Sequence, residues 1–240
     1  MARSQRLDKI LSNMGYGTRR EIKKVLKQSS ILVNGQAVKD GSRHVDPEKD
    51  RIEVDGELLQ YREYVYLMMN KPQGVISASF DPRDKTVVDL LDDAYRCFDL
   101  FPIGRLDKDT EGLLLLSNDG KLAHELLSPK KHVPKTYYAL VEGNVTEEDI
   151  SIFREGVVLD DGYKTLPAHL TILKSDQQSE IELTISEGKF HQVKRMFEAV
   201  NKKVSYLKRI SMDRIKLDGN LALGAYRELT EDEINILRNR

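Results

Sequence analysis

The apolar positions of the first sixty residues predict two short helices followed by a small sheet. Apolar side chains recur at helical spacing in residues 7–11 and again in residues 22–26. Two strand-like runs follow at 31–33 and 51–55, and the first of them ends at an Asn–Gly dipeptide, which is typical of a tight hairpin. The pattern therefore predicts an independent module over residues 1–61.

The remaining residues, 62–240, show strand patterns that are mostly separated by turns. These patterns lie at 65–69, 113–116, 135–141 and 180–185. The last of them alternates between apolar and polar side chains, as in a half-exposed strand. One amphipathic helix is predicted over 189–200, and the breaker-rich stretch 70–74 predicts a turn. Strands with few helices between them favour an α+β domain over a doubly wound parallel sheet.

Three helix starts are marked by a threonine that is followed three residues later by an acid. In such a capping box the threonine hydroxyl accepts a hydrogen bond from the backbone N–H of the acid, whose side chain accepts one from the backbone of the threonine. The three pairs are Thr18 with Glu21, Thr146 with Asp149 and Thr230 with Glu233. Each pair predicts a helix directly after its threonine.

Charge is distributed unevenly along the chain, although its sum is close to zero. The formal net charge is −1, which on its own argues against a nucleic-acid partner. Residues 1–44 contain ten Lys or Arg and three acids, a net of +7, and residues 186–216 contain nine and three, a net of +6, which leaves −14 for the rest. Because salt screens charges beyond about 10 Å, a polyanion responds to the two basic segments and not to the average.

Composition excludes several classes of protein. Hydrophobic residues make up 40% and charged residues 32% of the chain, which is typical of a folded protein. No apolar run approaches the ~20 residues of a membrane span, no secretory signal is visible, and the single cysteine, Cys97, excludes a disulfide framework. The five histidines lack metal-ligand spacing, and no phosphate-binding glycine motif occurs. We expect a cytoplasmic protein with no membrane contact, no metal and no cofactor.

Asp107 is the residue whose surroundings best suit chemistry. It lies in a charged loop between two glycines, just before a buried strand, where a carboxylate can be partly desolvated and kept ionised by a cation. Lys135 and Tyr137 begin one predicted strand, and a basic cluster begins the helix predicted over 189–200, so these ends could converge on a cleft. The spacing alone favours the plainer interpretation of an exposed polar loop.

The N-terminal segment resembles the S4 RNA-binding domain. The matching stretches are RLDKILSNMGYGTRREIKKVLKQSSILVNGQAV and DRIEVDGELL. The resemblance implies a small S4 (αL-type) domain whose basic second helix faces RNA. It assigns RNA contacts to Arg19, Arg20, Lys23, Lys24 and Lys27.

The rest of the chain resembles the RsuA/RluB/RluE/RluF group of pseudouridine synthases, and within it the small-subunit type. Four motifs stand in the order of that family, namely MMNKPQGVIS, GRLDKDTEGLLLLSNDG, KTYYALVEG and EGKFHQVKRMFEAV. The resemblance implies a catalytic domain on a mainly antiparallel mixed sheet, with flanking helices and a central active-site cleft. It also implies the isomerisation of one rRNA uridine to pseudouridine without a cofactor.

The family motifs imply roles for individual residues. Asp107 matches the catalytic aspartate that acts at C1′ of the uridine, and Tyr137 matches a tyrosine that stacks on the base. Lys194 occupies the basic position that pairs with the aspartate, where many relatives have arginine, and Arg105 matches an arginine that displaces the target nucleotide. The other residues assigned to RNA contacts are Lys71, Lys135, Lys189, His191, Gln192 and Arg195.

Three alternatives remain open at this point. The target could lie in 23S rRNA, although the chain's compact size, its lack of a basic C-terminal tail and the wording of MMNKPQGVIS favour 16S rRNA. The protein could be a non-catalytic RNA-binding or ribosome-assembly factor. The Asp107–Asp109 spacing superficially resembles the nucleophile loop of metal-dependent phosphohydrolases, but those loops follow a continuous apolar strand, which Asp107 lacks. We expect a monomer that acts on an assembly intermediate of a ribosomal subunit.

Overall fold

The computed structural model describes residues 4–239, which divide into two compact units. The N-terminal unit runs to Val65 and also includes Asp92–Asp99, and the larger unit consists of Tyr66–Leu91 and the residues from Leu100 onward. The chain therefore passes between the units three times. A single boundary after residue 61 did not anticipate the contribution of Asp92–Asp99 to the N-terminal unit.

The N-terminal unit is built from two helices and short strands around one apolar core. Helices α1 (Leu7–Asn13) and α2 (Ile22–Gln28) share this core with a four-stranded sheet. The sheet has the order β3-β2-β5-β6, with β2 at Ile31–Val33, β3 at Gln36–Ala37, β5 at Ile52–Val54 and β6 at Glu57–Leu58. A second pair joins β1 (Gln5–Arg6) to β4 (His44–Val45), and the short 3-10 helix η2 spans Asp93–Phe98.

The capping pair before α2 is present, but the helix begins later than predicted. The backbone N–H of Thr18 donates to the Glu21 carboxylate over 2.8 Å, and the Glu21 N–H donates to the Thr18 hydroxyl over 3.4 Å. Residues 19–21 form a turn and α-helical geometry starts at Ile22. The pairs at Thr146 and Thr230 form complete capping boxes at the starts of α4 and α6, as predicted.

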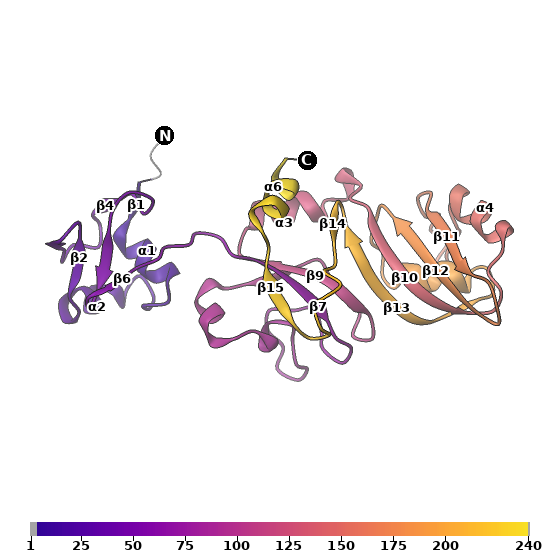
Figure 1. The fold of residues 1–240 in the computed structure, drawn as a ribbon, viewed down its shortest axis with the longest axis horizontal. Helices are drawn as coiled ribbons and strands as arrows, with labels where there is room; N and C mark the ends of the chain where they lie inside the picture. Colours follow the sequence, from indigo (N-terminus) through magenta and orange to yellow (C-terminus); the bar gives the residue numbers. More distant parts are fainter. Residues whose placement is uncertain (1–3, 240) are drawn as a thin grey trace. The chain divides into compact units, whose positions relative to one another are not determined.

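The larger unit is organised around a nine-stranded sheet, which Figure 1 shows as the arrows from β7 onward. Its main path has the order β11-β12-β10-β13-β9-β7-β15, and β8 and β14 pair at its side. The strands are β7 (Tyr66–Lys71), β8 (Phe101–Ile103), β9 (Glu111–Ser117), β10 (Lys135–Glu142), β11 (His169–Lys174), β12 (Gln178–Ile185), β13 (Lys203–Met212), β14 (Ile215–Lys216) and β15 (Tyr226–Glu228). Every named pair is antiparallel except β9 with β13, which confirms the mixed α+β class.

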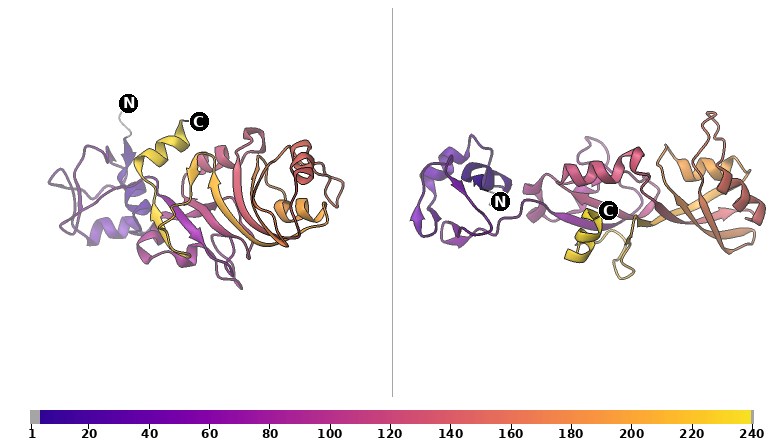
Figure 2. Two further views of the ribbon diagram at one scale, coloured as in Figure 1. Left: turned by 45° about the vertical axis from the view of Figure 1, so that its right-hand side comes forward. Right: turned by 90° about the horizontal axis from the view of Figure 1, so that it is seen from above.

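Helices lie on both sides of this sheet, as the turned views show (Figure 2). They are α3 (Gly120–Leu127), α4 (Glu147–Glu155), α5 (Gln192–Glu198) and α6 (Glu231–Arg238), with the short 3-10 turns η1 (Val88–Leu90) and η3 (Pro129–Lys131). Apolar side chains of α3 and α6 join one core with those of β7 and β9. Phe153 of α4 packs against Phe197 of α5, with ring centroids 4.9 Å apart.

Strand β10 places two neighbouring tyrosines on opposite faces of the sheet. Tyr137 lies beside Leu183 and Arg209 on its neighbouring strands, whereas Tyr138 lies beside Glu182 and Lys208. Because successive side chains of a strand point to opposite faces, the Tyr137 face is the buried one and the Tyr138 face is half-exposed. The candidate tyrosine is thus separated by the sheet from the polar row around Tyr138.

Two element boundaries differ from the sequence prediction for identifiable reasons. Strand β7 continues through Asn70 and Lys71, where a turn was predicted, because both residues pair with β9. Helix α5 begins at Gln192 and not at residue 189, because His191 has a φ of +48°, in the left-handed region. That conformation cannot continue a right-handed helix.

Candidate active site

The loop that carries Asp107 is anchored by a lysine beneath it. The Lys71 side chain is completely buried at the end of β7. Its ammonium group donates three hydrogen bonds, to the carbonyls of Pro72 (3.0 Å), Asp107 (3.0 Å) and Thr110 (2.9 Å). Burial lowers the pKa of Lys71 to about 8. A lysine predicted to contact RNA is therefore inaccessible, and its position suits holding the backbone of the loop.

Further contacts fix the same loop from the side of residues 74–84. The hydroxyl of Ser77 donates to the carbonyl of Leu106 over 2.9 Å and accepts from its N–H over 3.0 Å. The backbone N–H of Gly74 donates to the carbonyl of Lys108, whose ammonium group lies 2.6 Å from Asp84. The backbone around Asp107 is thus held on two sides, which is the arrangement a precisely placed carboxylate needs.

The carboxylate of Asp107 remains accessible, with the side chain 33% exposed. Its two oxygens lie 3.6 Å from Nε2 of His191 and 4.0 Å from Nζ of Lys194. Lys194 makes its shorter contacts to Asp109, 2.7 Å to each carboxylate oxygen. The hydrogen bond from Lys194 lowers the pKa of Asp109. Lys194 therefore lies near Asp107, its predicted partner, and in direct contact with Asp109, which was not predicted as a partner.

Tyr137 lies on the buried face of the sheet and is 8% exposed. Its cross-strand neighbour Arg209 is also buried, donates from Nε to the carbonyl of Leu113 over 2.8 Å, and has an Nη2 without a partner in the described residues. Gly112 makes this junction of β9 and β13 possible, because a Cβ at its φ of +102° would collide with the backbone of Arg209. The start of β9, and with it the Asp107 loop, is thereby joined to the strand beside Tyr137.

Comparison of the chain with known protein families identifies its family. The model of the RNA pseudouridylate synthase family matches residues 65–199, which contain every residue of this site except Arg209. The chain belongs to that family. The S4 domain model matches residues 5–57, so the synthase carries an S4 domain in front of its catalytic domain.

Similar proteins match the synthase over nearly its whole length. It is 55% identical to the RNA pseudouridine synthase YtzG of Bacillus subtilis (97% of this chain, 98% of the relative). It is 41% identical to the ribosomal large subunit pseudouridine synthase B of the same organism (98% and 96%) and 39% identical to the ribosomal small subunit pseudouridine synthase A of Yersinia pestis (95% and 96%). A crystal structure of a pseudouridylate synthase matches with a TM-score of 0.68 at 40% identity (98% and 100%).

The loop before α5 is held by its own polar contacts. Gln192 is buried, accepts from the N–H of Lys189 over 2.9 Å and donates to Glu187 over 2.8 Å. Arg195 is 14% exposed, forms an ion pair with Asp161 at 2.7 Å and donates a hydrogen bond to Asp160. The hydrogen bonds to these two carboxylates raise the pKa of Arg195. Gln192 and Arg195 were predicted to contact RNA, and in the synthase they hold this loop together.

The other predicted RNA-binding residues are more accessible. Arg105 is exposed and makes no ion pair within residues 4–239. Lys135 is half-buried and donates to the carbonyl of Val133 over 2.9 Å, and the exposed Lys189 lies 4.3 Å from the ring centroid of Tyr163. The five cations of the N-terminal unit, Arg19, Arg20, Lys23, Lys24 and Lys27, are all exposed.

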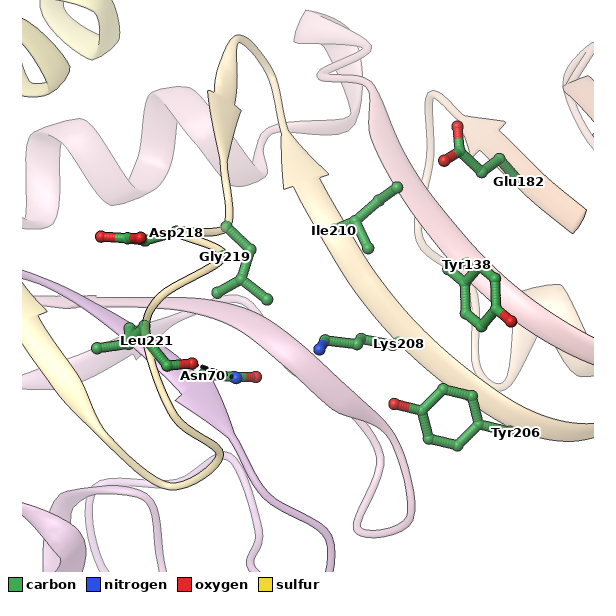
Figure 3. Close-up of a pocket in the computed structure, with 10 residues that line it drawn as sticks. Asn70, Tyr138, Glu182, Tyr206, Lys208, Ile210, Asp218, Gly219 and Leu221 are labelled. Carbon is green, nitrogen blue, oxygen red and sulfur yellow. Dashed lines mark hydrogen bonds between the residues drawn. The ribbon is translucent and has the colours of Figure 1, made fainter.

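A hollow of about 410 Å³ lies on the other face of the sheet (Figure 3). It is lined by the polar row around Tyr138 and Lys208, by Asn70 and by the segment 217–221. None of Asp107, Tyr137 and Lys194 borders it, so it is separate from the candidate site. Within residues 4–239 no cluster of three or more His, Cys, Asp or Glu is placed to bind a metal ion, and none of the helices in that range could cross a membrane.

Two contacts of the site were missed by the sequence reasoning. Asp109 takes the closest contact with Lys194, and only its position two residues after Asp107 pointed to it. Arg209 buries a guanidinium beside Tyr137. The available signal was Gly112, directly before the strand pattern at 113–116, because a glycine in a strand often marks a close approach of another backbone.

Proposed function

We propose that the synthase converts one uridine of rRNA to pseudouridine and that Asp107 is the catalytic carboxylate. The observation that supports this role is the contrast within one loop. The backbone of Asp107 is fixed by the buried Lys71, while its carboxylate stays accessible and has His191 and Lys194 within 4.0 Å. A nucleophile requires such a fixed and accessible carboxylate.

The reaction exchanges one glycosidic bond for another. The bond between C1′ and N1 breaks, the uracil rotates, a bond forms between C1′ and C5, and the hydrogen of C5 is lost as N1 gains a proton. Asp107 would act at C1′ while the base is detached, and Tyr137 would contact the base. Lys194 would stabilise the aspartate, a role it shares between Asp107 and Asp109. The isomerisation involves no net oxidation or reduction.

Because a base in folded RNA is inaccessible, the uridine must first be extruded at a cost of a few kcal/mol. Arg105 is exposed beside Asp107 and makes no ion pair in the described part of the chain, so its guanidinium is available to occupy the space that the uridine leaves. The exposed cations of α2 would bind the phosphates of the same RNA.

The 16S rRNA is our first candidate substrate, and the MMNKPQGVIS motif is the feature that favours it. Sequence identity supports 23S rRNA equally, because the large-subunit and small-subunit relatives are 41% and 39% identical to the synthase. Both RNAs therefore belong in the test.

The test uses 16S and 23S transcripts labelled with tritium at C5 of uridine. Pseudouridine formation releases this tritium to water, and we expect release from the 16S transcript by the synthase but not by Asp107→Asn. Tritium release from the 23S transcript alone would make 23S rRNA the substrate in place of 16S rRNA. Release by Asp107→Asn would refute the catalytic role, no release from either RNA would favour a binding factor, and loss of activity in EDTA would revive the metal-dependent alternative.

A further inference from the structure

The loop before α5 presents an apolar ring to solvent. Phe190 is 75% exposed. One face of its ring stacks on His191, with centroids 3.7 Å apart and an interplanar angle of 20°. Exposure of an apolar ring to water is unfavourable. A stacked pair of rings provides a flat apolar surface of the kind that nucleobases bind.

The loop holds this pair of rings in place. His191 has the left-handed φ of +48°, which costs energy for a residue other than glycine. The cost is offset by the contacts around it, since Glu187 accepts hydrogen bonds from Gln192, from the N–H of Leu166 and from the hydroxyl of Tyr163. A strained residue fixed by its surroundings is a common property of binding sites.

The pair of rings lies next to the candidate catalytic residue. Nε2 of His191 lies 3.6 Å from Oδ1 of Asp107. His191 therefore lies between the Phe190 ring and the carboxylate that would act on the target uridine. A base that stacks on Phe190 would be a neighbour of that uridine and not the uridine itself.

We propose that Phe190 and His191 form a stacking site for an unpaired nucleobase next to the target uridine, an inference that rests on the proposed function. When the uridine is extruded, the adjacent base loses a stacking partner. The Phe190 ring replaces this partner and so lowers the cost of extrusion. Aromatic stacking tolerates every base, so the site favours an unpaired RNA segment over a particular sequence.

The experiment compares Phe190→Ala, Phe190→Tyr and the synthase. Leu173→Ala is the matched control, because Leu173 of β11 is also an exposed apolar residue, at 51%. We expect Phe190→Ala to raise the Kd for the 16S and 23S transcripts by about ten-fold and to lower kcat/KM for tritium release at least as much. Phe190→Tyr keeps a ring and should retain both values. The loss in Phe190→Ala should persist at high salt, because stacking releases no counterions.

Equal Kd values for Phe190→Ala and Leu173→Ala on both transcripts would overturn the stacking site. A ten-fold loss in Phe190→Ala that Phe190→Tyr shares would also overturn it, since the ring would not be the cause. If the synthase releases no tritium, the proposed function has failed, and the Kd values still decide the stacking site. Unchanged thermal unfolding of Phe190→Ala, expected for an exposed side chain, excludes misfolding as the cause.

Discussion

The two basic segments of the synthase have nearly equal charge but use it differently. The five cations in and just before α2 are exposed, and within residues 4–239 only Arg19 among them pairs with a carboxylate, that of Asp8 at 3.0 Å. Around α5 Lys194 binds Asp109, and Arg195 binds Asp160 and Asp161. Free cations attract phosphate from solution, whereas paired cations hold protein parts in position. A charge count alone cannot separate these two functions.

The largest effect is expected from removing the carboxylate of Asp107, which lies 4.0 Å from Lys194 of α5. Asp107→Asn should lower kcat by at least about a thousand-fold, because the amide is not a nucleophile, while the Kd for rRNA stays within two-fold. Tritium release and filter binding measure the two quantities. Asp84→Asn is the matched control, as Asp84 is bound to Lys108 next to the same loop. A similar loss in Asp84→Asn would assign the effect to loop geometry.

The next largest effect is expected beneath the loop. Lys71→Met removes the donor shared by three buried carbonyls and should lower the free energy of unfolding by about 3 kcal/mol. Urea denaturation measures this change. Lys208→Met, a half-buried lysine without an ion pair among the described residues, should change it by less than about 0.5 kcal/mol. Equal effects would mean that Lys71 does not hold the loop.

Lys71 should also make activity depend on pH. Its pKa of about 8 lies below the usual value for lysine, so at higher pH the folded synthase loses this proton while the unfolded chain keeps it. The contribution of this group to the free energy of unfolding therefore rises above pH 8. A neutral amine has two N–H bonds for three carbonyls, so kcat/KM should fall with an apparent pKa near 8. The same falling limb in Lys71→Met would assign it to another group.

The cations in and just before α2 should control how binding depends on salt. Replacing Arg20, Lys23 and Lys24 with alanine should reduce the slope of log K against log salt by about 2, since each phosphate contact contributes about 0.7–0.9. Filter binding to the rRNA transcripts over a range of salt concentrations measures the slope. Arg195→Gln is the comparison and should leave the slope unchanged. If Arg195→Gln reduced this slope more than the triple variant, the segment around α5, and not the segment around α2, would be the one that binds phosphate.

The smallest effect is expected from the same Arg195→Gln variant in the absence of RNA. Its partners Asp160 and Asp161 are exposed, so losing these ion pairs should lower the free energy of unfolding by about 1 kcal/mol or less. Thermal unfolding of the two proteins side by side measures this difference. A loss several times larger would mean that the loop before α5 is a much greater part of the fold than its exposure indicates.

Local features of the fold were predictable from the sequence where neighbouring residues decide them. The capping boxes at Thr146 and Thr230 form as predicted, because both partners lie within one helical turn. The end of β7 and the start of α5 were wrong by two or three residues. Both depend on distant partners, β9 in the first case and the contacts that hold His191 in the second.

The candidate site was predictable as a set of motifs but not as a set of contacts. The motifs named Asp107, Tyr137 and Lys194, and whether these residues catalyse the reaction stays a prediction. The sequence could not tell which aspartate Lys194 binds most closely, because Asp107 and Asp109 are both acids of one loop. It also could not show that Lys71 is buried, since its three acceptors include backbone groups more than thirty residues away.

The segment Asp92–Asp99 bears on how this architecture can be divided or inherited. Cys97 packs so closely on Gly15 that a Cβ there would lie 2.6 Å from the Cβ of Cys97, and Arg62 lies 6.0 Å from the ring centroid of Phe98. The N-terminal unit is therefore completed by residues encoded within the catalytic half of the gene. Transfer of residues 1–65 alone would leave uncovered the surface on which Asp92–Asp99 packs, so an exchange of the S4 module needs both pieces.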